Sequence, residues 1–538
     1  MAPLALMALL GAAFVSACGS HQVSPIPPAV SRPGPESIFD PKGPLFADPA
    51  GTLNLMRRLG VDRVKVFVAW QSLAPNPYSR VRPRFAATSP AGYPASAWAA
   101  YDAIDRDAAA RGVALYFAVG GLAPLWATAP NPAPGGPYGG AQWRPSPAEF
   151  GQFVRAVATR YSGHYTPPGA SSPLPRVSFW SIWNEPNLGS ADLAPQAIDD
   201  STVEASPAMY RGLVDAAWSA LQSTGHGGDT ILIGELAPYG QTGDNSPGNY
   251  GEMVPLRFVR ALYCVGATDQ ALQGAPAAAR GCPASSAQSK RFAADHPGLF
   301  QASGFAMHPY PPEAGGGLPP NVPVPGSAPG SSEFVNMATL GRLEHLLDSV
   351  TGAYGSGKRF PIYITEYGYF TNPPYQYGTP LPTAAAYLNQ AEYMSWLDQR
   401  VSSFDQYLLI DPPSTSGSSF MTGLEFANGT RKPSYAAYRM PIFLPVTRAR
   451  RGQALDVWGC VRPAHYAEAS TGRPQDVLIE LQPGAGASFR TVGSATISNV
   501  HGYFDVRVRF PSSGTVRLAW SYPHGPTIYS RSVAISVG

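Results

Sequence analysis

Short apolar segments with strand character alternate with longer segments of helical periodicity over most of this chain. Eight such strand segments occur, each rich in β-branched and aromatic residues. Strands separated by helices favour parallel pairing, and eight repeats in one unit favour closure into a barrel over an open sheet. We therefore predict an α/β fold whose main domain, residues 36–445, is a (β/α)8 barrel.

The boundaries of these segments are read from the pattern. The predicted strands comprise ESIFD near residue 38 and residues 62–70, 113–120, 176–183, 230–235, 303–310, 361–366 and 404–410. The predicted helices comprise residues 50–59, 97–111, 147–161 and 208–222, one ending near Phe258, residues 334–350 and 384–400, and a short one after Lys432.

Long segments rich in proline and glycine follow several of the strands, at residues 129–145, 238–250, 309–332 and 411–431. Most connections from a helix to the next strand are short. Because the loops after the strands converge at one end of a parallel barrel, we expect a functional site at that end.

Two glutamates stand where apolar strands open into loops. Glu185 follows Asn184 in WSIWNEPN, and Glu366 precedes Tyr367 in PIYITEYGY. Glycosidic bond cleavage needs two carboxyl groups, one to protonate the leaving oxygen and one to attack the anomeric carbon. The alternative for the first motif is a helix start, with Asn184 as its cap and the acid in its first turn.

The sequence resembles the clan A glycoside hydrolases, the retaining (β/α)8 enzymes around families 5 and 39. In these enzymes Asn-Glu-Pro closes strand four and a second glutamate closes strand seven. The resemblance implies that Glu185 is the general acid/base, that Glu366 is the nucleophile and that Asn184 binds the sugar 2-hydroxyl. It predicts a glycosidase that hydrolyses O-glycosyl bonds of an oligo- or polysaccharide by double displacement. A transglycosylase and a non-catalytic cell-surface glycan-binding protein on a barrel scaffold are the alternatives.

Other polar residues at strand ends are weaker candidates for substrate binding. Relatives often place a His-x-Tyr pair near the nucleophile, which His308 and Tyr310 in AMHPY match; a satisfied histidine and a packing tyrosine are the alternative. Glu235, which closes ILIGE, binds a sugar hydroxyl or forms a structural ion pair. Lys65 fills a position where relatives commonly carry arginine, and it keeps the charge but loses the bidentate geometry.

Aromatic residues near strand ends form a further group. Trp70, Trp126 and Trp183 each end a strand or begin a loop, and each can cover the apolar face of a sugar ring or belong to the core. Where many relatives show a stacking tryptophan on strand eight, this chain offers Tyr407 or Asp411. The sugar, its linkage and the oligomeric state are left open by these motifs.

Charge and motif content exclude several classes of function. The 38 Lys and Arg residues nearly balance the 35 Asp and Glu residues, and no basic tract is present, so nucleic acid is a poor partner and carbohydrate a better one. The chain has no HExxH, paired CxxC, GxSxG or convincing dinucleotide-binding motif. We therefore predict neither a metal nor a cofactor.

The chain begins with an apolar run that ends in small residues before Cys18. Residues 1–17 are typical of an export signal peptide, and Val15-Ser16-Ala17-Cys18 resembles a bacterial lipobox, in which the cysteine is acylated. Residues 18–35 would then be a tether. We expect an exported protein, either a cell-surface lipoprotein whose lipid anchor is its only membrane contact or a secreted protein with an incidental cysteine.

Two further features fit an exported protein with a second domain. Cys264 and Cys282 flank an Ala/Gly/Gln-rich excursion and either form a disulfide or remain buried thiols, while Cys460 has no obvious partner. Residues 446–538 contain short alternating runs separated by turns, which predicts a small β-sandwich. That domain binds carbohydrate through aromatics such as Trp520 and Tyr522, or packs on the barrel as a cap or spacer.

Overall fold

A computed structural model describes residues 33–131, 137–198, 201–241, 246–312, 317–324, 330–413, 420–497 and 499–538. The expected signal peptide, Cys18 and the tether up to residue 32 lie outside the described residues. Among the helices of the described ranges, none has the length and apolar content needed to cross a membrane.

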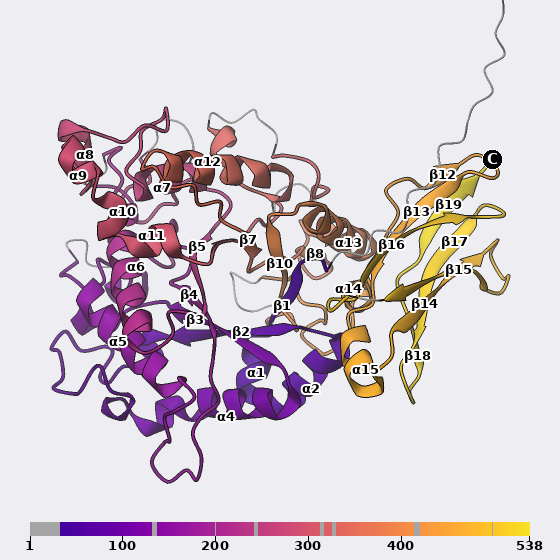
Figure 1. The fold of residues 1–538 in the computed structure, drawn as a ribbon, viewed down its shortest axis with the longest axis horizontal. Helices are drawn as coiled ribbons and strands as arrows, with labels where there is room; N and C mark the ends of the chain where they lie inside the picture. The colour runs from indigo at the N-terminus through magenta and orange to yellow at the C-terminus, as the bar shows by residue number, and fades with distance from the viewer. Residues whose placement is uncertain are drawn as a thin grey trace, which may run out of the picture.

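The main domain is a closed barrel of eight parallel strands, which confirms the predicted α/β fold (Figure 1). Around the barrel the strands run in the order β1, β10, β7, β6, β5, β4, β3, β2. Their bounds are β1 Glu36–Asp40, β2 Arg63–Ala69, β3 Ala114–Gly120, β4 Phe179–Ile182, β5 Thr230–Leu236, β6 Gly304–Met307, β7 Ile362–Ile364 and β10 Val401–Tyr407. A two-stranded ribbon of β8 Thr371–Asn372 and β9 Thr379–Pro380 lies in a loop after β7.

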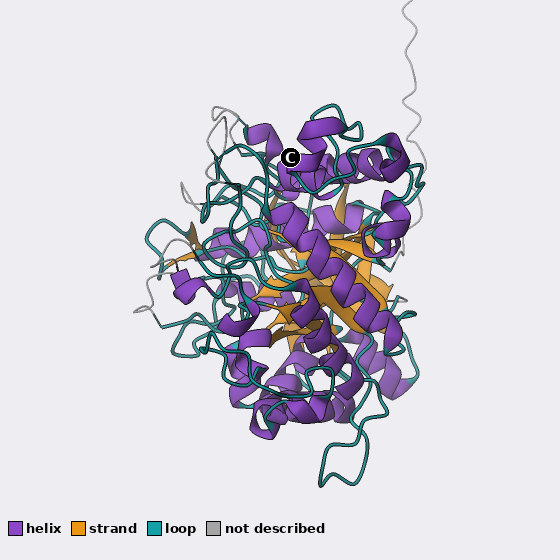
Figure 2. Ribbon diagram, turned by 90° about the vertical axis from the view of Figure 1, so that its left-hand side faces the viewer, coloured by secondary structure: helices purple, strands orange, loops and turns teal. Residues whose placement is uncertain are grey.

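Helices surround the barrel strands, as the second view shows (Figure 2). They are α1 Gly43–Ala47, α2 Pro49–Leu59, α3 Trp70–Leu73, α4 Ala95–Arg111, α5 Pro147–Arg160, α6 Ser206–Ser223, α7 Pro255–Leu262, α8 Gly274–Ala279, α9 Ser286–Ser289, α10 Phe292–Asp295, α11 Pro297–Gln301, α12 Leu340–Gly352, α13 Leu381–Leu397 and α14 Pro433–Arg439. Short 3-10 turns occur at Pro90–Gly92, Leu125–Ala127, Pro137–Gly140, Ser331–Glu333 and Met337–Thr339.

Alternation along the strands sends side chains to two separate cores. The lumen holds the small cluster of Ile38, Tyr116, Ala118, Phe179, Leu232 and Ala306. Side chains on the other face of the strands, such as Val64, Val66 and Val68 of β2, join a large cluster with the apolar faces of the helices. The lumen cluster is small, which leaves room for polar side chains at the carboxyl ends of the strands.

The structure differs from the predicted elements in several places. Helix α12 begins at Leu340 and not at 334, because Asn336 caps a 3-10 turn and Met337–Thr339 precedes the helix. Strand β10 covers 401–407, so residues 408–410 lie in the loop. Four short helices, α8 to α11, lie between α7 and β6. A disulfide joins Cys264 to Cys282 with a Cα–Cα distance of 5.6 Å.

The C-terminal domain consists of two sheets, β11-β13-β16 and β12-β19-β17-β14-β15 with β18 paired to β17. The bounds are β11 Ile442–Phe443, β12 Arg448–Ala449, β13 Ala454–Cys460, α15 Ala464–Thr471, β14 Gln475–Gln482, β15 Arg490–Ile497, β16 Tyr503–Arg509, β17 Gly514–Ser521, β18 Thr527–Tyr529 and β19 Val533–Val537. Apolar side chains of both sheets form one core. A barrel followed by a β-rich domain is therefore the observed architecture. Strand β11 lies before residue 446 yet pairs with β13, and Cys460 is a buried free thiol.

Candidate active site

Glu185 is held at the end of β4 by an unusual backbone path. Trp183 and Glu185 both have positive φ, at 71° and 32°. The Trp183 backbone passes so close to Gly120 that a Cβ at Gly120 would lie 2.6 Å from the Trp183 Cα. The Glu185 amide donates to the Glu235 carbonyl at 2.9 Å. Residues with a main chain held in this sparsely populated region cluster at functional sites, because surrounding contacts must enforce them.

Glu366 follows β7 and is buried among cationic and hydroxyl groups. Its Oε1 accepts from Lys65 Nζ at 3.1 Å, and its Oε2 accepts from the Tyr310 hydroxyl at 3.1 Å. Burial opposes the charge of this carboxylate, but Lys65, His308 and Lys42 overcome that effect and lower its pKa to about 2. Glu366 is therefore an ionised carboxylate at neutral pH.

The barrel brings the two glutamates to one place, as the strand ends predict. Glu185, His308 and Glu366 each contribute one side-chain atom to a group whose members all lie within 4.8 Å of one another. His308 lies between the carboxylates, with Nδ1 2.8 Å from Glu185 Oε1 and 3.8 Å from Glu366 Oε2. The side chain of Glu185 is 15% exposed and that of Glu366 8% exposed, so both can be reached from the loop side.

Glu235 is the fully buried centre of the hydrogen-bond network under this pair. A bulge in β5, where Gly234 and Glu235 both have positive φ, interrupts the register with β6 and directs the side chain into the lumen. Its carboxylate accepts hydrogen bonds from Lys65 Nζ at 3.1 Å, from His308 Nε2 at 2.8 Å and from the Thr365 side-chain hydroxyl at 3.1 Å. The Tyr116 hydroxyl also donates to it.

These donors fix the charge of Glu235. Burial raises the pKa of the Glu235 carboxyl, but Lys65 and the hydrogen bond from His308 outweigh burial and hold the pKa far below its ordinary value. Of the two roles predicted for Glu235, the structure places it in the ion pair, because its side chain is fully buried beneath the strand ends.

His308 is held as a cation between carboxylates. Burial lowers its pKa, but Glu366 and the hydrogen bonds to Glu185 and Glu235 together raise the pKa to about 10. Two carboxylates and an imidazole are also a ligand set for metal ions. In this structure both ring nitrogens of His308 are already hydrogen-bonded to carboxylates, Nδ1 to Glu185 and Nε2 to Glu235.

Lys65 connects the network to Glu366 as a single point charge. Its Nζ donates to Glu235, to Glu366 and to the Thr365 carbonyl at 3.2 Å, which uses all three of its protons. Burial opposes the charge of Lys65, but Glu235 and Glu366 raise its pKa well above the ordinary value. The Lys65 ammonium therefore donates to two carboxylates at once, whereas the planar guanidinium of an arginine would favour a bidentate pair with one of them.

The tryptophans predicted as sugar platforms lie elsewhere. Trp70 is fully buried, because the chain turns into α3 at this residue and packs the indole against Phe150 and Phe153. Trp183 is also fully buried, with its edge on Phe150. Trp126 is half-buried, packs against Trp70 and donates its Nε1 proton to the Pro75 carbonyl. The prediction that Trp70 stacks on a sugar is therefore wrong, because its ring is fully buried. Trp126 makes no contact with the described residues of the glutamate network.

Asn184 and the residues of strand eight take different positions. Asn184 is half-buried beside Glu185, and its amide lies 3.5 Å from Asp192 Oδ1. Tyr407 ends β10 with its ring beside Tyr310 at 6.4 Å between centroids. Asp411 is buried in a separate ion pair with Lys432 at 2.7 Å. Of the two strand-eight candidates, Tyr407 faces the site and Asp411 does not.

Several polar groups that the sequence analysis did not identify lie near the glutamate network in the structure. Asp40 ends β1, and Lys42 lies 3.3 Å from it with its ammonium 5.1 Å from the centre of the Tyr407 ring. Asp405 is fully buried on β10, and neither of its carboxyl oxygens has a hydrogen-bond partner among the described residues. Burial raises the pKa of both Asp40 and Asp405. Their positions within predicted strands were the available signal, but the register decides which face they occupy.

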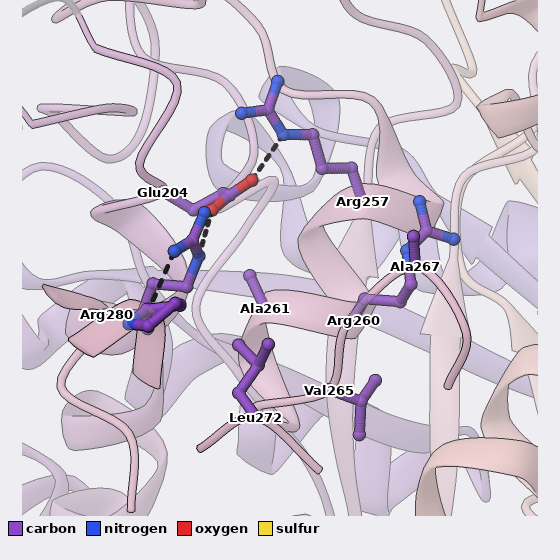
Figure 3. A pocket seen from close by; sticks show the side chains of 10 residues that line it. Glu204, Arg257, Arg260, Ala261, Val265, Ala267, Leu272 and Arg280 are labelled. Carbon is purple, nitrogen blue, oxygen red and sulfur yellow. Dashed lines mark hydrogen bonds and ion pairs between the residues drawn. The ribbon is translucent and has the colours of Figure 1, made fainter. Parts of the chain in front are cut away.

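A separate cavity of about 380 Å³ lies on the outer side of the barrel, beside α7. Figure 3 shows Arg257 and Arg280 on opposite sides of Glu204, each donating its Nε proton at 2.6 Å. Arg260 points away from this pair and binds Glu333. The arginines of this cavity are occupied by internal ion pairs, and none of its lining residues belongs to the glutamate network.

No protein-family model and no curated protein matches the chain. Similar solved structures are glycoside hydrolases. A family 39 glycoside hydrolase from Bacteroides cellulosilyticus WH2 is 14% identical, with coverage of 88% of this chain and 81% of that one and a TM-score of 0.45. A glucosidase from Croceicoccus marinus is 12% identical, with coverage of 86% and 92% and a TM-score of 0.43. An exo-β-1,4-mannosidase from an Opitutaceae bacterium is 15% identical, with coverage of 75% and 58% and a TM-score of 0.40.

These solved structures are of the class that the sequence motifs indicate.

Proposed function

We propose that this protein is a retaining glycoside hydrolase that cleaves O-glycosidic bonds of an oligo- or polysaccharide. The observation that carries the proposal is the close approach of two carboxyl groups with different surroundings, Glu185 and Glu366, at the loop end of the barrel. Their surroundings differ, since Glu366 accepts hydrogen bonds from Lys65 and Tyr310, whereas the Glu185 carboxyl has one side-chain partner among the described residues, His308.

In the first step, a carboxylate oxygen of Glu366 attacks the anomeric carbon, and the glycosidic C–O bond breaks. The bonding electron pair passes to the leaving oxygen, which takes a proton from Glu185. His308 occupies Oε1 of Glu185, which leaves Oε2 to carry that proton. The products of this step are the freed aglycone alcohol and a glycosyl ester on Glu366.

In the second step, Glu185 accepts a proton from water while the water oxygen attacks the anomeric carbon. The ester bond to Glu366 breaks and its electron pair returns to the carboxylate, where Lys65 and Tyr310 donate to it. Two displacements at one carbon retain its configuration. A sugar hydroxyl in place of water would give transglycosylation by the same groups.

The separation of the carboxyl groups supports retention over inversion. Retaining glycosidases place the two groups about 5 to 5.5 Å apart, whereas inverting ones leave about 6.5 to 9.5 Å for an intervening water. An oxygen of Glu185 lies within 4.8 Å of an oxygen of Glu366. His308 lies beside both groups, with Nδ1 2.8 Å from Glu185 Oε1 and 3.8 Å from Glu366 Oε2.

The test is incubation of the exported chain with a panel of neutral plant and microbial polysaccharides, followed by measurement of new reducing ends. We expect release by the wild type and a loss of at least about 10⁴-fold in Glu366→Ala. The anomer of the first product, followed by NMR, should have the configuration of the substrate. An inverted first product would refute the retaining mechanism.

A matched control is Glu333→Ala, which removes a carboxylate that binds Arg260 on the outer side of the barrel. We expect this variant to keep wild-type activity. Equal release by Glu366→Ala and the wild type would refute Glu366 as nucleophile. Retention of glycan binding without release by any variant would favour the non-catalytic glycan-binding alternative.

We propose further that the protein is exported and acylated at Cys18. The lipobox-like sequence motivates this proposal, and the Cys264–Cys282 disulfide supports it because such bonds persist in oxidising compartments. Metabolic labelling with a radioactive fatty acid should mark the wild type and leave Cys18→Ala unlabelled. Equal labelling of both would refute acylation at this residue.

A further inference from the structure

A second cavity of about 380 Å³ lies on the C-terminal domain, on the outer face of its larger sheet. Strands β14, β17 and β18 form its floor, on the right-hand side of Figure 1, with the barrel on the left. Leu478, Ala519 and Tyr529 lie in one row across these strands, since Ala519 pairs with both of the others. A small residue between two large ones makes the hollow.

The walls of this hollow are exposed apolar groups. Leu478 is 39% exposed and Tyr529 is 40% exposed, although residues at alternate positions of the same strands are buried in the core. Strand β14 places Leu478 on the outer face between Asp476 and Glu480. Leu478 and Tyr529 together form a small apolar patch on an otherwise polar outer face.

The Tyr529 ring is held rigidly. The Arg517 guanidinium lies 3.8 Å from the centre of the Tyr529 ring and 3.7 Å from that of Phe489. Arg517 is itself fixed by Glu480, which accepts from its Nε at 2.8 Å. One face of the tyrosine is therefore packed against Arg517, and the exposed part of the ring lines the cavity as a preorganised platform.

Hydrogen-bonding groups surround the apolar walls. Ser521 and Thr527 lie on the outer face with their hydroxyls 3.0 Å apart, so that one hydroxyl proton is left over from the pair. Asp476 accepts the Thr496 hydroxyl at 2.6 Å through Oδ1, which leaves Oδ2 as an acceptor. An apolar ring face edged by hydroxyl and carboxylate groups matches the amphipathic surface of a pyranose.

The charges at the cavity favour a neutral ligand. Two carboxylates, Asp476 and Glu480, line it, and the neighbouring Arg517 is paired with Glu480. A phosphate, sulfate or uronate would meet repulsion from Asp476, and no lysine or arginine is among the described residues that line the cavity. Neutral sugar hydroxyls can instead donate to the carboxylates.

We propose that this cavity is a second glycan-binding site, which takes one or two residues of a neutral polysaccharide chain. Leu478 and Tyr529 contact the ring faces, and Asp476, Ser521 and Thr527 bind the hydroxyls. Of the two aromatics considered for carbohydrate binding, Trp520 borders the cavity but is only 2% exposed in the sandwich core, and Tyr522 packs against its edge. The site does not depend on catalysis in the barrel.

The test uses the full chain with Glu366→Ala, so that no glycan is consumed. Affinity electrophoresis through gels containing xylan, glucomannan or mixed-linkage β-glucan measures binding. We expect retardation by at least one of them, and a loss of affinity of about tenfold on adding Tyr529→Ala. Ser521→Trp, which adds bulk at an exposed position and fills the cavity, should give the same loss without touching the platform.

The matched pair Asp476→Ala and Asp456→Ala separates the cavity from the rest of the domain. Asp456 lies on β13 in the other sheet and pairs with Arg507, with its side chain 51% exposed. We expect weaker binding for Asp476→Ala and no change for Asp456→Ala. Absence of retardation by every neutral gel, retardation only by an anionic gel such as alginate, or equal affinity of Ser521→Trp would overturn the proposal.

The same substitutions in the active chain distinguish this site from the barrel. Tyr529→Ala should hydrolyse short soluble oligosaccharides at the wild-type rate and lose activity only on polymers. A loss on short oligosaccharides as well would place the effect in the barrel and overturn the proposal.

Discussion

Buried charges gather in two regions of this molecule, at the mouth of the barrel and where the C-terminal domain meets the barrel. At the mouth, acidic groups outnumber basic ones: the carboxyls are Asp40, Glu185, Asp192, Glu235, Glu366 and Asp405, and the bases are Lys42, Lys65 and His308. Several of these carboxyls have raised pKa values because burial disfavours their charge.

At the domain contact, acidic and basic groups are paired with one another. Arg462 lies 2.5 Å from Glu392 of α13, which also accepts the Tyr503 hydroxyl at 2.8 Å. Asp62, at the start of β2, accepts from Ser37 and pairs with His501 at 3.0 Å. The apolar side chains of Trp396, Trp458 and Tyr503 pack beside these pairs.

The difference between the two clusters indicates that the charges at the domain contact stabilise the arrangement of the domains, whereas those at the barrel mouth are kept for chemistry. Balanced pairs at the domain contact fix the orientation of two bodies at little net electrostatic cost. An excess of buried carboxyls costs stability, so its presence at the mouth indicates that those groups are kept for another purpose. Substitutions at the mouth should therefore mainly lower activity, and substitutions at the domain contact should mainly lower the free energy of unfolding.

Among the changes that test this comparison, the largest effect is expected from Lys65→Met. Without this ammonium the pKa of Glu366 rises from about 2, because Lys65 is the leading group that lowers it. We expect kcat/KM to fall about 10²- to 10³-fold. Since a nucleophile with a higher pKa is protonated at higher pH, the acid limb of the pH–rate profile should move to higher pH.

The control is Lys432→Met, which removes an equally buried lysine paired with Asp411 outside the network. Its acid limb should stay in place. An unmoved acid limb in Lys65→Met would show that Lys65 does not set the charge of Glu366.

Arg462→Ala tests the domain contact. It leaves Glu392 buried without its cation, and breaking such a pair costs about 3 to 5 kcal/mol of unfolding free energy. Urea denaturation measures this loss. Activity per folded molecule should be unchanged, because no described contact joins Arg462 to the mouth; a fall in kcat with unchanged stability would contradict the division between the two regions.

Asp405→Asn should stabilise the protein at neutral pH. Burial raises the pKa of Asp405 above its ordinary 3.8, so its stabilising contribution is complete below that value and is lost as pH rises through the raised pKa. Asparagine has no such loss. We expect the variant to gain about 1 kcal/mol on the wild type between pH 4 and pH 8, measured as melting temperature against pH.

Asp411→Asn is the matched control, because it replaces a buried acid that has a cation and leaves Lys432 unpaired. That variant should lose stability at the same pH. Destabilisation by Asp405→Asn at pH 8 would mean that Asp405 is a paired carboxylate.

The smallest effect is expected from His501→Gln. Burial lowers the pKa of His501, but the hydrogen bond with Asp62 raises it above the ordinary 6.5, while His501 in turn holds the pKa of Asp62 below 3.8. The pair therefore stabilises most between about pH 4 and 6.5; its contribution is lost as pH rises through the His501 pKa or falls through the Asp62 pKa. We expect a loss of about 1 kcal/mol at pH 5 and little at pH 9, by thermal denaturation.

His465 lies near the same carboxylate, 3.7 Å from Asp62, and its pKa is lowered by burial. Because a lowered pKa costs stability as pH falls below 6.5, His465→Gln should gain stability at pH 5 and change little at pH 9, the opposite of His501→Gln. An equal loss in both variants would assign the interaction to packing instead of charge.

Much of the mouth was predictable because strand ends are readable. Glu185, Glu366, His308 and Tyr310 all follow apolar runs, and a parallel barrel brings such positions to one end. Lys65 was also found, although its contact with a second carboxylate was not expected. The pattern correctly predicted the strand on which each of these groups lies and the end of that strand.

The predictions that failed concern strand register and the direction in which a side chain points. Trp70 follows β2 directly, yet the helix that begins there turns its ring into the outer core. Asp405 lies inside a predicted strand, and a shift of one residue would have put it on the other face. Tyr116 lies in an entirely apolar run, so only the contact of its hydroxyl with Glu235 reveals its role.

The sequence by itself determined the alternation of strands and helices, and with it the barrel, the domain order and the positions of two glutamates at strand ends. Those features follow from local periodicity, which each segment carries independently. Tertiary structure alone decided that Glu235 joins Lys65 to His308, that the buried Asp405 carboxyl has no hydrogen-bond partner among the described residues, and that Arg517 packs on the Tyr529 ring of the second sheet. Such contacts join residues far apart in the chain, and they depend on bulges, register and close backbone approach that no local pattern specifies.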